Sequence, residues 1–222
     1  MSAGFFRRLT SSLIDMTLVI LVIYLSFILI GRSYIQGQIE NYDEINNNYN
    51  EIMTVYNQDL IELQDEYQAN KVIAGEDEEQ LDAAWDIYVE KSEMIRQQNL
   101  IDTEPYVEPL GTYITNSVYY YIGLFLLIAT IYTLALKGLT LGRRAMNIEL
   151  SGPVNLLSVF LHDIVFKYLL VIVLVPINIL IAIMLLMLMG LIDTGLIAAS
   201  RNKNTIRDMI TKITVTKRER KI

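Results

Sequence analysis

The sequence predicts an all-α fold: a multi-pass transmembrane helix bundle that carries a helical hairpin outside the membrane. Apolar residues make up 53% of the 222-residue chain, and they gather in runs at about residues 13–30, 113–136 and 155–199. About 20 consecutive apolar residues suffice to cross a bilayer as a helix. The hairpin is predicted by a long acidic segment between the first two runs, in which apolar residues recur at helical spacing.

The first domain, residues 1–32, holds the first predicted span at about residues 10–31. This run is longer than a signal-peptide core and no small-residue cleavage site follows it, so we expect an uncleaved span. Asp15 lies inside the run, after Arg8 near its start. A carboxylate within a span costs about 2.5–3.5 kcal/mol. We therefore expect Asp15 to face a partner group, a cavity or a pathway.

The second domain, residues 33–111, is predicted to be an antiparallel helical hairpin with a coiled-coil-like seam. Apolar residues recur every three or four positions along its first arm, close to a heptad period. They are Ile35, Ile39, Tyr42, Ile45, Tyr49, Ile52, Tyr56, Leu60, Leu63 and Tyr67. The stretch 74–77 breaks the pattern, and a second helix follows that contains Trp85 and Tyr88. The seam either joins the two arms or binds a partner, which is a second copy of the chain or an envelope protein.

Charge is divided unevenly along the chain. Residues 33–111 contain 19 acidic and 3 basic residues, a net charge of −16, and the rest contains 6 acidic and 15 basic residues, a net charge of +9. Basic residues near span ends mark the cytoplasmic side. They precede the first span, follow the second and follow the last apolar run. We therefore predict a multi-pass protein of the cell membrane, with both termini cytoplasmic and residues 33–111 extracytoplasmic.

The third domain, residues 112–200, holds the remaining spans, and residues 201–222 form a basic cytoplasmic tail. This orientation requires an even number of crossings between residues 155 and 200. We favour four spans, at about 10–31, 112–136, 155–175 and 178–199, with a turn around Pro176 because proline lacks a backbone donor. The alternative has three spans, with residues 155–167 lying in the interface.

The order of these features resembles the RDD family of integral membrane proteins, which is named for one arginine and two aspartates. Arg8 and Asp15 match the arginine and the aspartate of the first helix, and Asp208 looks like the second aspartate. The loop 139–148 looks like the basic segment that follows the second span in this family.

The residues of that loop that resemble the family segment are Gly142, Arg143 and Arg144. The resemblance covers residues 4–31 and 113–216, so the hairpin is an insertion outside the usual pattern. It implies a transport-related or membrane-scaffold protein, with cation or proton exchange suggested for some members.

The charged residues near the membrane allow two interpretations. Asp15 is expected to accept from Lys167, from Asn116 or from a basic residue of the loop after the second span, and Asp208 is a candidate partner for Arg8. Together these residues either form a charge clamp that fixes helix packing or form a relay for ions or protons.

The third predicted span contains His162 and Asp163, with Lys167 at i+4 from Asp163, where the two side chains meet on an α-helix. Histidine changes charge near neutral pH, so His162 either passes a proton or is a solvated interfacial residue. Asp193, near the end of the last span, either joins Asp15 in a cation site or is exposed at the interface.

The chain has no cysteine and one histidine, and it contains no hydrolase, metalloprotease, P-loop or dinucleotide motif. We therefore expect no catalytic residue, no metal, no cofactor and no enzymatic activity. The basic tail is expected to attract lipid, at about 1 kcal/mol per basic side chain, rather than nucleic acid. Two functions remain: an oligomeric transporter-like protein in which Asp15 and Asp193 handle cations or protons, and a scaffold that binds a partner through the hairpin.

Overall fold

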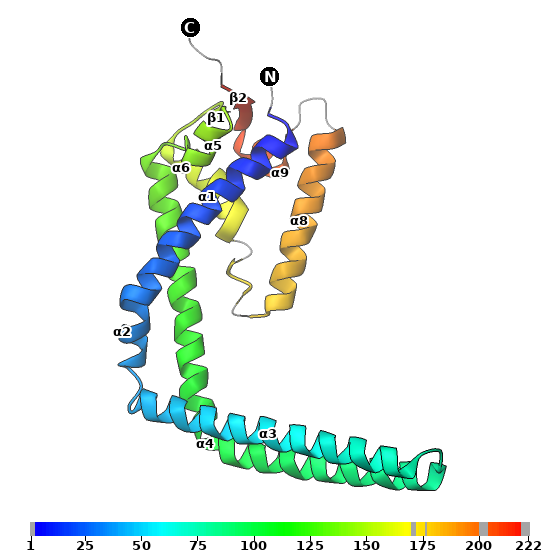
Figure 1. Ribbon diagram of the computed structural model, residues 1–222. Coiled ribbons are helices and arrows are strands. Elements are labelled where there is room, and N and C mark those ends of the chain that lie inside the picture. Colours follow the sequence, from blue (N-terminus) through cyan, green and yellow to red (C-terminus); the bar gives the residue numbers. More distant parts are fainter. Residues whose placement is uncertain (1–2, 170–171, 176, 200–203, 219–222) are drawn as a thin grey trace. The chain divides into compact units, whose positions relative to one another are not determined.

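The structure, a computed structural model of the chain, describes residues 3–169, 172–175, 177–199 and 204–218. The protein is mostly helical (81%), as the predicted fold class requires. It divides into two compact units, one made of Met1–Leu29 with Tyr119–Ile222 and the other of Ile30–Val118. Figure 1 shows the order of the elements along the chain.

Three helices in the described part of the chain are long and apolar enough to cross a membrane: Phe5–Gln36, Glu78–Ala135 and Leu180–Ala199. They consist of α1 (Phe5–Ser26), the π-helix η1 (Phe27–Gly31), α2 (Arg32–Gln36), α4 (Glu78–Ala135) and α8 (Ile179–Ala199).

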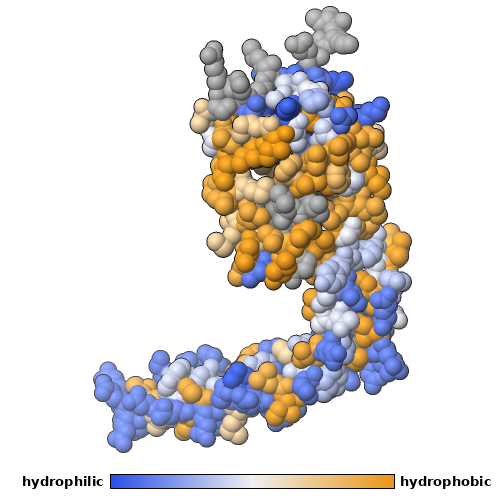
Figure 2. Space-filling view, turned by 180° about the vertical axis from the view of Figure 1, so that it is seen from behind, coloured by the Kyte–Doolittle hydropathy of each residue, from blue (hydrophilic) through white to orange (hydrophobic). Residues whose placement is uncertain are grey.

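The face of the first unit that Figure 2 shows is apolar over much of its height. Leu21, Leu127 and Met184, one from each of its long helices, are exposed. Exposed apolar side chains at this density mark a surface that is covered by lipid or by another protein. Together with the lengths of the three helices, this surface supports a membrane protein with transmembrane helices.

The segment predicted as a third span is helical in its first part. α6 (Leu156–Phe160) leads directly into the π-helix η2 (Leu161–Leu169), and residues 173–175 form part of a turn. Pro176, expected at that turn, lies outside the described residues. A π-helix of this length is rare, since most π-type segments are single turns within α-helices, and such turns are frequent at functional sites.

A two-stranded antiparallel sheet, absent from the sequence-based prediction, pairs β1 (Ile148–Ser151) with β2 (Thr214–Lys217). Its core consists of Ala3, Ile148 and Val215, all buried. The N–H of Ala3 donates to the carbonyl of Val215 at 2.8 Å. Residues 214–217, which the sequence placed in a basic tail, are therefore folded against the start of the chain.

The second unit is a hairpin of two antiparallel helices, α3 (Tyr42–Ala74) and the first part of α4 (Figure 1). Gly75 ends α3 with φ of +59°, a conformation that favours glycine. The ring of Tyr67 lies 5.6 Å from that of Trp85 and 5.0 Å from that of Tyr88. Aromatic residues of the predicted seam therefore join the two arms.

Candidate functional site

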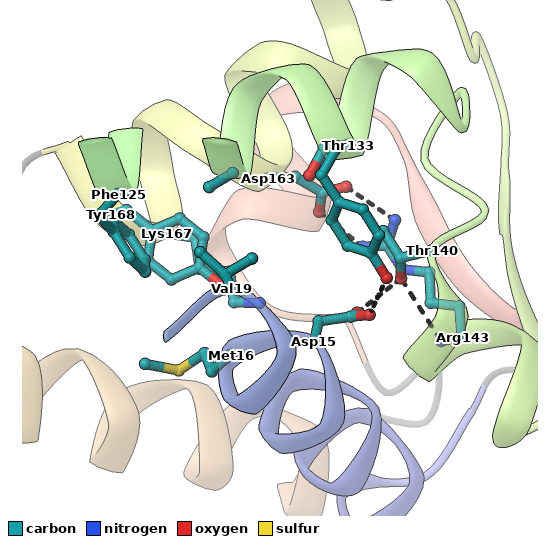
Figure 3. A pocket seen from close by; sticks show the side chains of 12 residues that line it. Asp15, Met16, Val19, Phe125, Thr133, Thr140, Arg143, Asp163, Lys167 and Tyr168 are labelled. Carbon is teal, nitrogen blue, oxygen red and sulfur yellow. Dashed lines mark hydrogen bonds and ion pairs between the residues drawn. The ribbon is translucent and has the colours of Figure 1, made fainter. Parts of the chain in front are cut away.

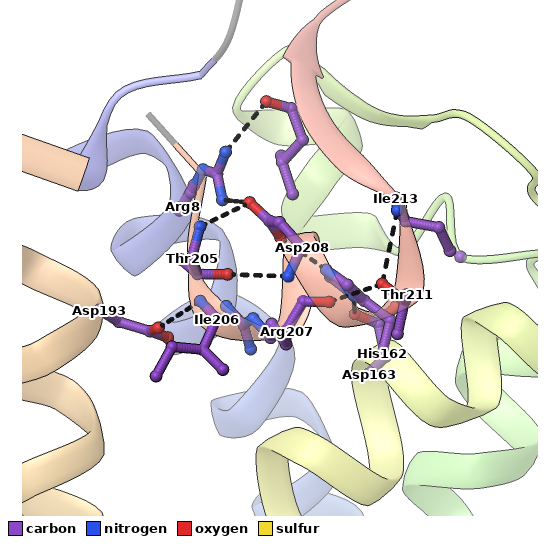
Figure 4. Close-up of polar contacts among 12 residues, drawn as sticks. Arg8, His162, Asp163, Asp193, Thr205, Ile206, Arg207, Asp208, Thr211 and Ile213 are labelled. Atoms are coloured by element: carbon purple, nitrogen blue, oxygen red, sulfur yellow. Dashed lines mark hydrogen bonds and ion pairs between the residues drawn. The ribbon is translucent and has the colours of Figure 1, made fainter. Parts of the chain in front are cut away.

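A row of charged residues of alternating sign lies where α1 begins, next to β2 and to α9 (Ile206–Thr211) (Figure 4). Arg8, near the start of α1, is buried, and its Nη1 donates to Oδ2 of Asp208 in α9. Its Nε donates to the carbonyl of Ala3 at 3.1 Å and its Nη2 to that of Val215 at 3.3 Å. Arg8 therefore holds α1 to both α9 and β2, and the expected contact with Asp208 is present.

His162 is the middle member of this charged row and is fully buried. The interpretation of His162 as a solvated residue at the membrane interface was therefore wrong. Its Nε2 lies 2.8 Å from Oδ1 of Asp208 and its Nδ1 lies 2.7 Å from Oδ1 of Asp163. Ionised carboxylates only accept hydrogen bonds. The arrangement therefore requires either an imidazolium at His162 or a proton shared with one of the two carboxyl groups.

Arg143 of α5 (Leu141–Ala145) is the last member of the charged row. It forms a bidentate contact with the carboxylate of Asp163, at 2.7 and 2.6 Å. The expected pairing of Asp163 with Lys167 is absent. In a π-helix the repeat is i→i+5, so residues at i and i+4 no longer stack as they do in an α-helix. Burial would lower the pKa of Arg143, but the charge of Asp163 raises it above its usual value.

Asp208 is also part of the local structure of α9. Thr205 caps this helix: its N–H donates to Asp208 at 3.1 Å, and its hydroxyl accepts from the N–H of Asp208 at 3.3 Å. Burial would raise the pKa of Asp208, but hydrogen bonds from His162 and Arg8 hold it well below its usual value of 3.8. The carboxylate is therefore kept ionised by the partners that surround it.

Asp15 has neutral hydrogen-bond partners, and they are not the expected candidates Lys167, Asn116 or a basic residue of the loop after the second span. Oδ1 accepts from the hydroxyl of Tyr132 at 2.7 Å and from the N–H of Gly142 at 2.8 Å, and Oδ2 accepts from the hydroxyl of Thr140 at 2.6 Å. Among the described residues, no lysine or arginine forms an ion pair with Asp15. The contacts attach α1 to α4, to Thr140 before α5 and to α5 itself.

Gly142 allows this close approach because it has no side chain. A Cβ at this position would lie 2.1 Å from the carbonyl oxygen of Ser11 and 2.9 Å from the carboxyl group of Asp15. The contact with Ser11 is to backbone, so the movement of a side chain cannot relieve it. The glycine of the predicted loop motif is therefore required where α5 crosses α1.

A small cavity lies beside Asp15 (Figure 3). Its volume is about 20 Å³, which is enough for about one water molecule. Asp163, Lys167 and Tyr168 also line it. The Nζ of Lys167 lies 4.8 Å from the centre of the Tyr168 ring and forms no ion pair within the described part of the chain. Three groups that can exchange a proton, Asp15, Asp163 and Lys167, thus line one small space.

Two residues from the sequence analysis lie outside this arrangement. Asp193 of α8 accepts from the N–H of Ile206 at 3.3 Å and is not a partner of Asp15. Arg144 is exposed, and its Nε donates to the carbonyl of Leu139 at 3.1 Å. Within the described ranges, no cluster of three or more acidic or histidine residues could hold a metal ion.

Tyr132, Thr140 and Thr205 are parts of the site that were not predicted from the sequence. Thr140 and Thr205 each precede a short helix, and threonine before a helix is a common N-cap signal that could have identified them. Tyr132 carries no comparable signal within an apolar helix. No protein-family model, curated protein or solved structure matches this chain.

Proposed function

We propose that this chain is a transport-related membrane protein of the RDD type that takes up and releases protons at the cavity beside Asp15. The proposal is supported by the order of Arg8, Asp15 and Asp208 along the chain and by the burial of Arg8 and Asp208 in one charge cluster.

The observation that carries the proposal is the shared lining of the cavity. Asp15, Asp163 and Lys167 surround a space for about one water molecule. Ionisable groups within membrane helices are expensive and are usually kept where ions or protons pass. Asp163 also contacts His162, so a further ionisable side chain lies next to the residues that line the cavity.

The proposed orientation is four spans with the charge cluster on the cytoplasmic side. It is supported by the position of α9 and β2, which contact the start of α1 through Arg8 and Ala3. Two ends of the chain on one side of a membrane require an even number of crossings. Basic residues also flank this region, in agreement with the positive-inside rule, so the acidic hairpin would be extracytoplasmic.

The test is proton flux into liposomes that contain the purified protein and a pH-sensitive dye. Asp15→Asn preserves the size of the side chain but removes the group that binds a proton. We expect this variant to lose at least about tenfold in flux while its thermal unfolding in detergent stays cooperative. Asp193→Asn, which removes a carboxylate from α8 away from the partners of Asp15, is the matched control and should retain its flux. Unchanged flux in a folded Asp15→Asn protein would contradict the proposal.

A scaffold that uses the hairpin is the second candidate, and exposed apolar residues favour it. Val72 and Ile73, near the end of α3, are 82% and 78% exposed. The test is chemical cross-linking of the full chain and of a variant lacking residues 36–104, both in native membranes. If the protein is such a scaffold, the variant without residues 36–104 should form no cross-linked products. Cross-linked products that persist in this variant would argue against the scaffold function.

A further inference from the structure

An apolar groove runs along the side of the first unit next to the cavity at Asp15, with which it shares the lining residues Met16, Phe125, Lys167 and Tyr168. It has a volume of about 530 Å³ and almost wholly apolar walls. α1 lines it from Met16 to Tyr24 and α4 from Tyr121 to Phe125. Eight residues of α-helix extend about 12 Å, so the groove is longer than a single side chain.

One end of this groove carries positive charge. Among the described residues that line it, Lys167 is the one charged residue, and it lies beside Tyr168. α9, which carries Arg207, packs against η2, which carries Lys167 and Tyr168. Lys167 in the groove lining and Arg207 on the neighbouring helix therefore belong to two elements that contact each other.

Arg207 lacks an anion in the part of the chain that the structure describes. Its Nε is buried and has no hydrogen-bond partner. It has no carboxylate within ion-pair distance, and the adjacent Asp208 is already engaged by Arg8 and His162. A buried donor without a partner costs about 1–3 kcal/mol, so the position favours a ligand that supplies an acceptor.

We propose that this groove binds one anionic glycerophospholipid, with its phosphate at Lys167 and Arg207 and an acyl chain along the apolar walls. A phospholipid supplies both chemistries that the groove presents, an anion at one end and a hydrocarbon chain beyond it. A helix from a second copy would supply only the apolar part. Basic pockets between membrane helices on the cytoplasmic side are known to bind anionic headgroups.

The test compares phosphatidylglycerol with phosphatidylcholine of the same acyl chains, added to the full-length protein in detergent and measured as bound lipid by native mass spectrometry. We expect phosphatidylglycerol to bind more tightly. Arg207→Gln should weaken it about fivefold, equivalent to about 1 kcal/mol per basic side chain, and leave phosphatidylcholine unchanged. Ile122→Trp, which fills the groove from α4, should weaken both lipids.

Arg218→Gln is the charge-matched control, because Arg218 lies after β2 and is exposed; it should bind both lipids as the native protein does. Arg207→Lys should restore most of the preference, which separates charge from folding. Equal binding of the two lipids by the native protein would overturn the proposal, as would unchanged phosphatidylglycerol binding in Arg207→Gln. Displacement by glycerol phosphate alone would also overturn it, because it would indicate a site for soluble phosphate.

Discussion

Arg8 and Asp208, separated by 200 positions in the sequence, form a buried ion pair that joins the first helix to α9. The pair is extended by His162, Asp163 and Arg143 into a row of charged residues of alternating sign. Each member has at least one partner of opposite charge, and this mutual compensation is what allows so many ionisable groups to be buried together.

Removal of one member of the Arg8–Asp208 pair should destabilise the protein strongly, because it leaves a buried charge without its partner. We expect Arg8→Met and Asp208→Asn each to lower the free energy of unfolding by about 3–5 kcal/mol, and the double variant to lose less than the sum. Thermal or denaturant unfolding in detergent measures these losses. Arg7→Met, an exposed neighbour, is the control; additive losses in the double variant would argue against direct coupling.

Substitution of Gly142 tests the close approach of α5 to α1. In Gly142→Ala the new methyl group would meet the backbone carbonyl of Ser11, and overpacking of this kind costs about 1–3 kcal/mol. The unfolding temperature in detergent should therefore fall. Gly123→Ala is the matched control because nothing lies within 4 Å of the added methyl group, and in a helix this change stabilises by about 1 kcal/mol. Equal effects at the two glycines would contradict the packing assignment.

The pH dependence of stability should report on Asp208. The pKa of Asp208 in the folded protein lies below its usual value of 3.8. Its contribution to the free energy of unfolding is therefore fully present above about pH 4 and is lost as the pH falls through the lowered pKa. Unfolding measured from pH 6 downward should show native stability that decreases on acidification below about pH 4. The Asp208→Asn variant should show a shallower decrease. An identical slope in the variant would mean that other carboxylates control the transition.

The aromatic cluster of the hairpin can be followed through Trp85, the only tryptophan in the chain. Tyr67→Ala removes two ring contacts, and each aromatic pair contributes about 0.5–1.5 kcal/mol. The emission of Trp85 should shift to longer wavelength and the hairpin should unfold at a lower denaturant concentration. Val72→Ala, near the end of α3, should leave both measurements unchanged. An unaltered spectrum in Tyr67→Ala would show that these rings do not stabilise the hairpin.

Features that depend on local sequence could be predicted. The spans predicted at about 10–31, 112–136 and 178–199 coincide with three helices of membrane-spanning length, because length and apolar content can be read from the local sequence. No helix of that length lies in the described part of residues 155–175, the remaining span of the favoured prediction. The period of apolar residues around Tyr67 predicts the two arms and the seam between them.

Features that depend on distant parts of the chain could not be predicted. The strands β1 and β2 pair residues that are nearly 70 positions apart, as Ile148 does with Lys217, and neither strand is long enough to show a pattern by itself. The pairing of Asp163 depends on a π-helix that hydropathy does not reveal. The hydrogen bonds of Asp15 depend on Gly142 and on a neighbouring helix that brings Tyr132 close.

Contacts between the beginning and the end of the chain also impose an order on biogenesis. During synthesis α1 emerges first, yet Arg8 obtains its carboxylate only after residue 208 has been translated, and Ala3 obtains its acceptor only after residue 215. A nascent polypeptide that stops before that point contains apolar helices long enough for a bilayer but leaves this arginine uncompensated. Translation past residue 215 is therefore the step that permits the cluster around Arg8 and Asp208 to assemble.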